Sequence, residues 1–328
     1  MARREWPLEE LIAGIRDGDR RALARAISLV ENGDPLAYPV VRELYPETGR
    51  ATVIGITGPP GVGKSSLIGA LVSHLRGLEQ TVGVVSVDPS SPFSRGALLG
   101  DRIRLSEHFL DPGVYIRSMG SRGHLGGLAE TTLQAVLLLD AFGKDVVFVE
   151  TVGAGQSDVE VTGIADSVLL VLMPGSGDSV QALKAGIMEI PDVIAINKMD
   201  HPGAKTMLNE VRSIVRLAEA ERRPPIVLTE AVRGENVSEL WGELERHRAA
   251  LLEDGRLEER RRWNLVAEVF AVASNRAKAH LESAVRSDPE LERLLGQVQR
   301  RELDPLSAVR EILEQVYRLD SDRSGVTP

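Results

Sequence analysis

The feature that most constrains the fold of this chain is a glycine-rich loop sequence that follows a short apolar segment. Residues 58–65 read Gly-Pro-Pro-Gly-Val-Gly-Lys-Ser, a full match to G-x-x-x-x-G-K-S. The β-branched segment Thr52–Ile56 precedes this loop, and an amphipathic segment follows it. The pattern therefore predicts a strand, a loop and a helix in that order, with the loop at the end of a sheet.

Each residue type in this loop has a chemical reason. Glycines let backbone N–H groups converge on phosphates, and the following helix directs its positive N-terminal end toward them. We expect Lys64 to reach the β and γ phosphates and the Ser65 hydroxyl to ligate Mg²⁺. The residues predicted to bind a nucleoside triphosphate here are Gly58, Pro59, Pro60, Gly61, Val62, Gly63, Lys64, Ser65 and Ser66.

Short apolar segments alternate with helix-length amphipathic segments through the middle of the chain. The expected strands are Val53–Ile56, Val82–Val87, Asp145–Val149, Ser167–Leu172, Val193–Ile196 and Ile226–Leu228. Segments of this kind are typical of a buried parallel sheet that is covered by helices. The predicted fold class is α/β, a P-loop NTPase with a mostly parallel central sheet, flanking helices and helical extensions at both ends.

A second motif follows the expected strand Val193–Ile196. It reads Asn197-Lys198-Met199-Asp200 and matches N-K-x-D, the motif with which G proteins recognise guanine. The Asp200 carboxylate can accept hydrogen bonds from the guanine N1–H and exocyclic amine, and adenine offers no such donor pair. We therefore predict a guanine nucleotide, GTP or GDP, held by Asn197, Lys198 and Asp200.

A second base-side loop is expected after the strand Ile226–Leu228. G proteins usually place a Ser-Ala sequence against the base there, whereas this chain reads Thr229-Glu230-Ala231-Val232. Ala231 and Val232 are candidates for backbone contacts with guanine. An ordinary strand-to-helix turn is the alternative interpretation.

Carboxylates occur where expected strands end near the phosphate loop. Asp88 follows one strand, Asp101 lies in a Gly- and Ser-rich segment, and Glu150 ends a third strand. Oxygen ligands of this kind suit Mg²⁺. The predicted metal ligands are Ser65, Asp88, Asp101 and Glu150, and the predicted catalytic residues are Lys64, Asp101 and Glu150.

The segment after Glu150 is expected to sense the γ-phosphate, with Gly153 near it. Small G proteins have Asp-x-x-Gly at this point and a Gln that orients the attacking water, whereas this chain reads Glu150-Thr151-Val152-Gly153-Ala154-Gly155-Gln156. We therefore predict slow unassisted hydrolysis, with the missing group supplied by dimerisation or by a partner.

The composition excludes several function classes. The formal net charge is −9, which argues against duplex nucleic acid as a partner. The chain has no Cys, so disulfides, thiolate metal sites and cysteine nucleophiles are excluded. No apolar segment approaches the roughly 20 residues of a membrane helix, and residues 1–6 do not resemble a secretory signal. We expect a cytoplasmic protein with neither nucleic acid nor membrane as partner.

The hydrophobic pattern divides the chain into three expected parts. Residues 1–48 are an N-terminal helical extension, residues 49–252 are the P-loop G domain, and residues 253–328 are a C-terminal helical arm. The charged sequence Glu258-Glu259-Arg260-Arg261-Arg262 in this arm is interpreted as a solvated helix face.

Taken together, the motifs resemble those of the MeaB/ArgK family, the GTPases that accompany adenosylcobalamin-dependent methylmalonyl-CoA mutase. The resemblance covers nearly the whole chain. It is carried by residues 58–65, 86–92 (Ser-Val-Asp-Pro-Ser-Ser-Pro), 99–102 (Leu-Gly-Asp-Arg), 117–123 (Arg-Ser-Met-Gly-Ser-Arg-Gly), 150–157 and 197–200.

This resemblance implies a nucleotide-dependent homodimer whose C-terminal helices form a dimerisation arm. It also implies a G-protein chaperone that gates delivery of adenosylcobalamin to the mutase and protects or reactivates that enzyme. By the same resemblance, Asp88, Asp101 and Glu150 surround Mg²⁺ and phosphate. Switch segments are implied near residues 89–104, 150–158 and 175–184, where Asp178 and Lys184 couple the nucleotide state to the client.

Two other classes of GTPase stay open at this point. A metal-delivery GTPase of the hydrogenase or urease maturation type needs Cys and His ligands, but the six His are dispersed and only His124 lies in a Gly-rich segment. A protein-targeting GTPase needs a Met-rich groove or a basic RNA-binding face, but the chain has six Met and an acidic balance.

Overall fold

The computed structural model describes residues 6–88, 105–120, 127–151, 163–175, 191–217 and 223–317. The chain forms two compact units, Met1–Val269 and Phe270–Pro328. No helix among these described residues is both long enough and apolar enough to cross a membrane.

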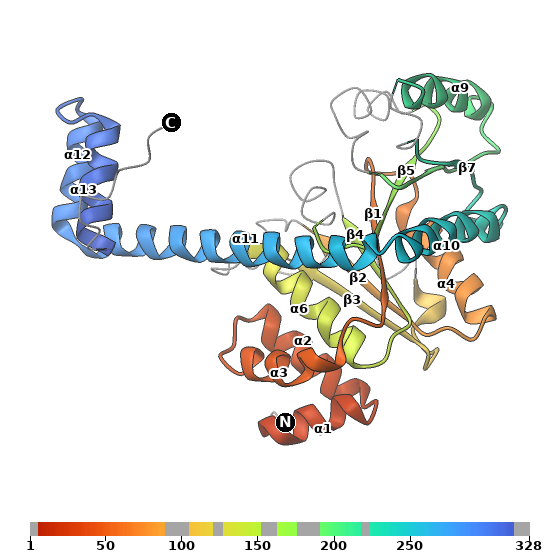
Figure 1. The fold of residues 1–328 in the computed structure, drawn as a ribbon, viewed down its shortest axis with the longest axis horizontal. Helices are drawn as coiled ribbons and strands as arrows, with labels where there is room; N and C mark the ends of the chain where they lie inside the picture. Colours follow the sequence, from red (N-terminus) through yellow and green to blue (C-terminus); the bar gives the residue numbers. More distant parts are fainter. Residues whose placement is uncertain are drawn as a thin grey trace. The chain divides into compact units, whose positions relative to one another are not determined.

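A parallel sheet forms the centre of the first unit (Figure 1). Its described strands are β1 (Thr52–Thr57), β2 (Val82–Asp88), β3 (Val114–Gly120), β4 (Val146–Thr151), β5 (Ser167–Leu172), β6 (Val193–Ile196) and β7 (Ile226–Leu228). They are ordered β3-β2-β4-β1-β5-β6-β7, and each neighbouring pair is parallel. The carboxyl ends of all these strands therefore lie at one edge of the sheet.

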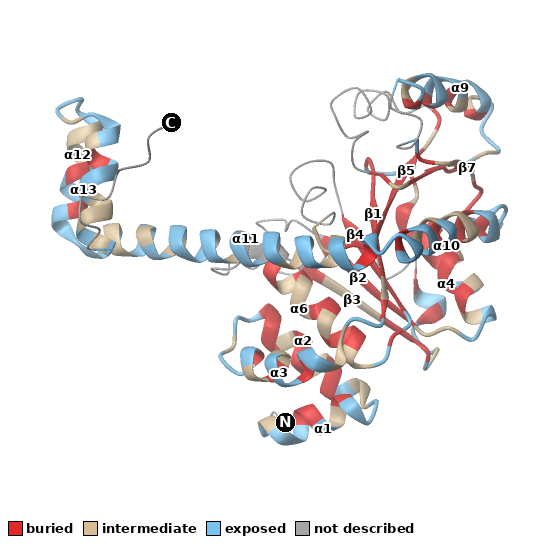
Figure 2. Ribbon diagram, viewed as in Figure 1, coloured by how far each residue is buried: buried red, intermediate tan, exposed pale blue. Residues whose placement is uncertain are grey.

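Helices cover both faces of the sheet, and its central strands are buried (Figure 2). Successive side chains of a strand point to opposite faces. In β1, Ile54 and Ile56 pack with α4 (Lys64–Gly77) and α10 (Val237–Glu253). Val53 packs on the other face, in the cluster that contains the residues of the N-terminal helices and α6.

The N-terminal helices α1 (Leu8–Arg16), α2 (Arg20–Glu31) and α3 (Ala37–Leu44) form a small bundle that contacts α6 (Gly127–Ala141). The short helix η1 (Tyr45–Glu47) leads from this bundle toward β1, and η2 (Ser106–His108) precedes β3. At the far end of the sheet, α9 (Ala204–Val215) covers β6 and β7.

The six strands expected from the sequence are all present, and β3 is the strand that the hydrophobic pattern missed. Its sequence, Val-Tyr-Ile-Arg-Ser-Met-Gly, interrupts the apolar residues with Arg117 and Ser118. Arg117 is tolerated because its guanidinium binds the buried carboxylate of Glu31 in α2, at 2.5 and 2.9 Å, and the hydroxyl of Ser28. A tertiary ion pair therefore permits a charge in this edge strand.

The interpretation of residues 258–262 as a solvated helix face was wrong for two of its arginines. These residues lie in α11 (Arg256–Ser287). Arg260 binds Asp192 through two hydrogen bonds of 2.9 and 3.1 Å. Arg261 binds Asp166 through two hydrogen bonds of 2.6 Å and also donates to the carbonyls of Gly49 and Ala51. Both arginine side chains are about three-quarters buried.

Asp166 and Asp192 stand immediately before β5 and β6, so each carboxylate has a second role. Asp166 accepts the Val53 N–H at 2.9 Å, and Asp192 accepts the Val168 N–H at 2.8 Å. The paired arginines hold the first turns of α11 against the amino edge of the sheet. Burial opposes ionisation of Asp192, but hydrogen bonds from His247 and Arg260 outweigh it and lower the pKa of this carboxyl.

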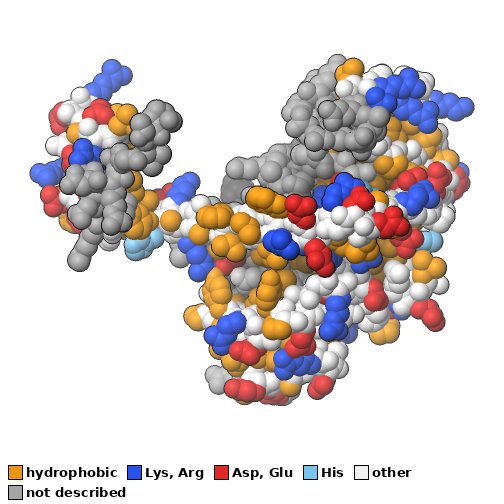
Figure 3. Space-filling model, in the orientation of Figure 1, with side chains coloured by type: hydrophobic (Ala, Val, Ile, Leu, Met, Phe, Trp, Pro, Cys, Tyr) orange, Lys and Arg blue, Asp and Glu red, His pale blue; other side chains and the backbone are white. Residues whose placement is uncertain are grey.

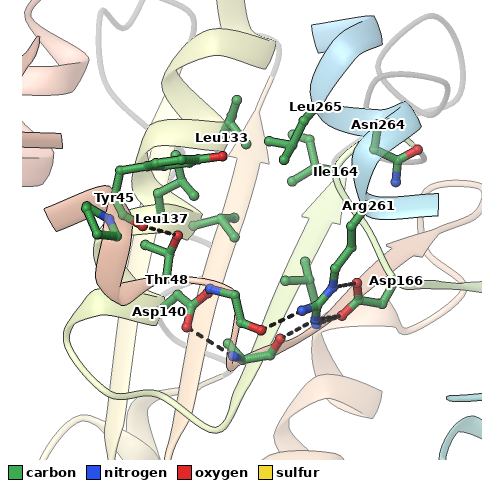
Figure 4. A pocket seen from close by; sticks show the side chains of 16 residues that line it. Tyr45, Thr48, Leu133, Leu137, Asp140, Ile164, Asp166, Arg261, Asn264 and Leu265 are labelled. Carbon is green, nitrogen blue, oxygen red and sulfur yellow. Dashed lines mark hydrogen bonds and ion pairs between the residues drawn. The ribbon is translucent and has the colours of Figure 1, made fainter. Parts of the chain in front are cut away.

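Arg261 also borders an apolar cavity of about 350 Å³ between η1, α6 and α11 (Figure 4). Tyr45, Leu137 and Leu265 line its walls. Asp140 closes one end, where its carboxylate accepts the N–H groups of residues 49–51. The polar groups around this cavity are therefore bound mainly to the protein itself.

The second unit consists of the end of α11, α12 (Pro289–Gln299) and α13 (Pro305–Tyr317). The Asp288 side chain caps α12 by accepting the Glu290 N–H at 2.8 Å. The Tyr317 hydroxyl donates to the Ala277 carbonyl at 3.2 Å, which ties α13 to α11. The helical C-terminal segment expected from the sequence is therefore present.

Replacing Arg261 tests the anchor of α11. Arg261→Met leaves the Asp166 carboxylate, whose side chain is 3% exposed, without its cation. We expect this variant to lower the free energy of unfolding, measured in urea, by about 3–5 kcal/mol. The control is Arg256→Met, because Arg256 and its partner Asp254 are both more than half exposed; its effect is expected within about 1 kcal/mol. If the two substitutions lowered the free energy of unfolding equally, Arg261 would not be an anchor of α11.

Candidate functional site

The loop between β1 and α4 has a backbone that only glycine permits at two positions. Gly58 has φ 140° and Gly63 has φ 94°. A Cβ atom on Gly58 would lie 2.1 Å from the Val171 carbonyl oxygen in β5. A Cβ atom on Gly63 would lie 2.5 Å from Nδ2 of Asn197. The glycines of the motif therefore serve close packing as well as the curvature of the loop.

Lys64 begins α4, and its ammonium group folds back over the loop. Nζ donates to the carbonyls of Gly58 at 2.6 Å and Pro59 at 3.2 Å, and the residue is buried. No described side chain caps the first N–H groups of α4. These N–H groups and the helix dipole give the loop the chemistry of an anion site.

Ser65 and Glu150 form the second part of the site. The Ser65 hydroxyl donates to Oε1 of Glu150 at 2.8 Å, and the Ser86 hydroxyl donates to Oε2 at 3.3 Å. Glu150 is 2% exposed. These three side chains come from α4, β4 and β2, so the parallel strand ends bring the predicted ligands Ser65 and Glu150 into contact.

Several predicted residues fall outside this description. Asp88 is the last residue of β2 and pairs with Gly120 of β3, but its side chain lies outside the described residues. The other predicted positions outside the described residues are Asp101, His124, Gly153, Gln156, Asp178 and Lys184.

Asn197 connects three segments through its buried amide. Its Nδ2 donates to the Val62 carbonyl of the phosphate loop at 3.0 Å. Its Oδ1 accepts the Ala231 N–H at 3.1 Å and the Thr229 hydroxyl at 3.3 Å. The amide thereby joins the phosphate loop, the end of β6 and the loop after β7.

Lys198 and Asp200 lie on the exposed side of this junction. Lys198 has φ 57°, and its Nζ donates to the Gly61 carbonyl at 3.1 Å. Asp200 is exposed and shares a hydrogen bond with Glu230. This bond is the main cause that lowers the pKa of Asp200 and raises the pKa of Glu230. Asp200 is therefore held as a carboxylate, which is the form that accepts N–H donors.

The structure brings three further predicted residues together beside the Asn-Lys-Met-Asp turn, residues 197–200. Ser66, Ala231 and Val232 line one groove, which continues along α4 to His74. The two residues after Glu230 differ in environment. Ala231 is buried with its N–H bound to Asn197, whereas Val232 is 85% exposed. Ala231 is therefore part of the loop junction, and Val232 lies on its rim.

Sequence reasoning did not select Ser86, Thr229 or Glu230. Each contacts a residue that the motifs did select: Ser86 binds Glu150, Thr229 binds Asn197, and Glu230 binds Asp200. Glu230 carried the clearest signal, since it stands where G proteins usually have Ser.

The fold and the loop define the class of protein. A G-x-x-x-x-G-K-S loop joins β1 to α4 at the carboxyl edge of a parallel sheet, and an Asn-Lys-x-Asp turn packs against it. This combination defines a P-loop nucleoside triphosphatase.

Comparison with known proteins gives the family. The model of the family described as "Methylmalonyl Co-A mutase-associated GTPase MeaB" matches residues 23–286. A Pyrococcus abyssi protein that carries the name of a GTPase is 45% identical and covers 94% of this chain and 97% of its own. The GTPase ArgK of Escherichia coli is 33% identical over the same shares of the two chains.

A solved structure agrees with this comparison. The crystal structure of the LAO/AO transport system kinase superposes with a TM-score of 0.73 at 27% identity, over 97% of this chain and 100% of that chain. The chain belongs to the MeaB family of methylmalonyl Co-A mutase-associated GTPases. It is accordingly a P-loop GTPase, related to the chaperones that accompany the mutase.

Asn197→Ala tests the junction of the three segments. The substitution removes the partners of the buried Ala231 N–H and of the Val62 carbonyl, and each orphaned group costs about 1–3 kcal/mol. We expect GTP and GDP affinities, measured by calorimetry, to fall about tenfold or more. The control is Asn264→Ala, because Asn264 makes a single 3.3 Å hydrogen bond to Ala165 beside α11. Unchanged nucleotide affinity in Asn197→Ala would refute the role of this amide.

Proposed function

We propose that this GTPase is a chaperone of an adenosylcobalamin-dependent acyl-CoA mutase, namely methylmalonyl-CoA mutase or a related enzyme. In this role it gates delivery of the cofactor and protects or reactivates the mutase. The observation that carries the proposal is the match of residues 23–286 to the family model, and the buried Ser65–Glu150 contact, which connects the phosphate loop to the end of β4, supports a nucleotide-dependent role. The family's name supports the client, and a Caenorhabditis elegans relative is the methylmalonic aciduria type A homolog.

The nucleotide is proposed to lie along the carboxyl edge of the sheet. Residues 58–66 bind the phosphates, and Lys64 leaves its loop carbonyls for the β and γ phosphates. Asp200 accepts the guanine N1–H and exocyclic amine, while Asn197 and Lys198 hold the loops around the base. Ala231 and Val232 border the base, and Gly153 lies near the γ-phosphate.

The donor set at the loop suits Mg²⁺. Ser65 offers a hydroxyl and Glu150 a carboxylate 2.8 Å from it, and oxygen donors of this type are what Mg²⁺ prefers. We propose that Ser65, Asp88, Asp101 and Glu150 hold the ion, partly through water. When bound, the ion neutralises charge on the phosphates.

Hydrolysis by the chain alone is proposed to be slow. Lys64, Asp101 and Glu150 are the proposed catalytic residues. The sequence that begins at Glu150 differs from the Asp-x-x-Gly pattern of small G proteins, and it does not have the usual placement of the Gln that orients the attacking water. A group from the client or from a second copy of the chain would then complete the site, so that hydrolysis reports on the assembled complex.

A homodimer is proposed through the C-terminal arm, residues 253–328. Hydrophobic side chains gather along α11 in Figure 3. Trp263, Val266 and Val269 follow each other at helical spacing and are 68%, 44% and 67% exposed. An exposed apolar stripe of this kind is typical of a surface that a partner covers.

Nucleotide state is proposed to control the client through segments that contact the γ-phosphate. The proposed segments are residues 89–104, 150–158 and 175–184, and Asp178 and Lys184 are proposed to couple the nucleotide state to the client. Such segments have two arrangements; the γ-phosphate of GTP favours one of them, and its loss on hydrolysis favours the other. GTP and GDP forms are then expected to bind the mutase with different affinities.

Turnover measurements test the client. We expect the purified protein to hydrolyse GTP slowly, and we expect the adenosylcobalamin-dependent mutase of the same organism to stimulate this about tenfold or more. Lys64→Ala is the blank and ATP is the control nucleotide. The proposed client would be refuted by two results together: the mutase does not change the rate of GTP turnover, and the GTP and GDP forms bind the mutase with equal affinity.

Light scattering with and without a GTP analogue tests the dimer. Trp263→Glu places a charge in the apolar stripe and is expected to weaken self-association about tenfold or more. Arg212→Glu introduces the same side chain at an exposed position of α9, outside the stripe, and is expected to leave the dimer in place. A monomeric wild-type protein in both nucleotide states, or a dimer that Trp263→Glu does not affect, would contradict the proposal.

A further inference from the structure

A pocket with polar and apolar walls lies at the amino edge of the sheet, whereas the phosphate loop lies at the carboxyl edge. Its volume is about 390 Å³, and sites for small molecules have about 300–1,000 Å³. The second half of α10 forms one wall, and the segments that begin β1 and β4 form the other. The lining residues that matter here are Ile54, Gln80, Val146, Trp241, Leu244 and Arg248.

Three buried polar atoms of this pocket have no hydrogen-bond partner among the described residues. They are Oε1 of Gln80, Nε1 of Trp241 and Nε of Arg248. Trp241 is 5% exposed and packs in the core with Leu244. Buried polar groups are nearly always paired, because an orphaned group loses the hydrogen bonds that water would give it. The pocket therefore offers two donors and one acceptor that a ligand can pair.

The local structure fixes where these three side chains start. Trp241, Leu244 and Arg248 are three and seven residues apart in α10, so they lie on one face of this helix. Gln80 stands in an ordered turn after α4. Its N–H donates to the Leu75 carbonyl at 3.1 Å, and its own carbonyl accepts from the Arg76 guanidinium at 2.7 Å. The pocket is thus built on a helix and a fixed turn.

The charged side chains around the pocket indicate the charge of the ligand. Arg50 and Arg248 line it, and in the described part of the chain neither arginine forms an ion pair. Asp145 and Glu245 also line it, are exposed, and balance the two arginines in number. Oδ2 of Asp145 already accepts the N–H and the hydroxyl of Thr81. The unpaired guanidinium groups favour an anion, and the two carboxylates disfavour a multiply charged one.

The size and the apolar walls of the pocket indicate more than a bound water molecule. One water accounts for about 30 Å³ of liquid, so the pocket has room for several non-hydrogen atoms of a ligand. Ile54, Val146 and Leu244 are buried residues of its walls. Such walls suit a hydrocarbon group, because its transfer from water to an apolar surface is favourable.

We propose that this pocket binds a small organic acid that carries a hydrogen-bond donor beside its carboxylate, of the α-hydroxy acid or α-amino acid type. The carboxylate accepts from the N–H groups of Trp241 and Arg248. The hydroxyl or ammonium group donates to Oε1 of Gln80, and the hydrocarbon group packs on Ile54 and Leu244. This site is separate from the proposed nucleotide site, and it does not depend on the proposed function.

The test compares three probes that share one carbon skeleton. L-leucine carries an ammonium group beside its carboxylate, leucic acid carries a hydroxyl there, and isocaproate carries neither. The readout is the indole N–H signal of Trp241 in NMR spectra. The chain has three Trp, and the signal of Trp241 is the one that Trp241→Phe removes.

We expect L-leucine or leucic acid to shift this signal in a saturable way, with a dissociation constant of about 1 mM or lower. Isocaproate is expected to bind about tenfold more weakly, because it leaves the Gln80 oxygen unpaired. The tighter of the two donor-bearing probes distinguishes an amino acid from a hydroxy acid.

Two variants test the assigned contacts with the tighter probe. Arg248→Met keeps an apolar stem without the guanidinium and is expected to weaken binding about tenfold or more. Gln80→Leu removes the acceptor and is expected to abolish the preference for this probe over isocaproate. The matched control is Arg246→Met, on the same helix, because the Arg246 side chain is 66% exposed and pairs with Glu243; it is expected to bind like wild type.

Several results would overturn the proposal. If none of the probes shifts the Trp241 signal of the wild-type protein at about 10 mM, ten times the expected dissociation constant, the pocket holds water only. Isocaproate that binds as tightly as both donor-bearing probes overturns the assigned donor. Equal probe affinities of Arg248→Met and Arg246→Met overturn the assigned carboxylate contact. The signals of Trp6 and Trp263 report whether each variant is folded, and the comparison of probes on the wild-type protein needs no variant beyond the signal assignment.

Discussion

The arrangement of the site depends on one buried amide. Asn197 follows the last residue of β6; its side-chain N–H donates to the phosphate loop, and its side-chain oxygen accepts from the Thr229 hydroxyl and from the Ala231 N–H in the loop after β7. A side-chain amide donates from its nitrogen and accepts at its oxygen, two separate atoms, whereas an ionised carboxylate only accepts. The phosphate loop, the end of β6 and the loop after β7 are therefore joined by one connected set of hydrogen bonds.

The opposite edge of the sheet is fixed by ion pairs. Asp166 and Asp192 start β5 and β6, and Arg260 and Arg261 of α11 bind them. The same two strands end at Leu172 and Ile196, and the next residue after β6, Asn197, binds the phosphate loop. Both strands are hydrogen-bonded to neighbours on each side, and they connect the first turns of α11 to the edge of the sheet where the phosphate loop lies.

The parts of the fold that the sequence predicted are those with strong local signals. Uninterrupted apolar segments predicted six strands, because a strand buried on both faces has few polar residues. Strand β3 was not predicted, because Arg117 interrupts its apolar sequence and is neutralised only by Glu31, which lies 86 residues away in the chain. Arg260 and Arg261 were misinterpreted for the same reason. A charged helical sequence does not show that Asp192 and Asp166 lie at the edge of the sheet and bind these arginines.

For the site, the loop at residues 58–65 and the turn at residues 197–200 were determined by the sequence itself, because backbone curvature and phosphate chemistry fix which residue types fit at each position. The sequence also determined the family. The partners of these motifs were decided only by the tertiary structure: Ser86 beside Glu150, Thr229 beside Asn197, and Glu230 beside Asp200. Hydrogen bonds depend on distances of a few ångströms between residues far apart in the chain, and those distances exist only once the strands are aligned in register.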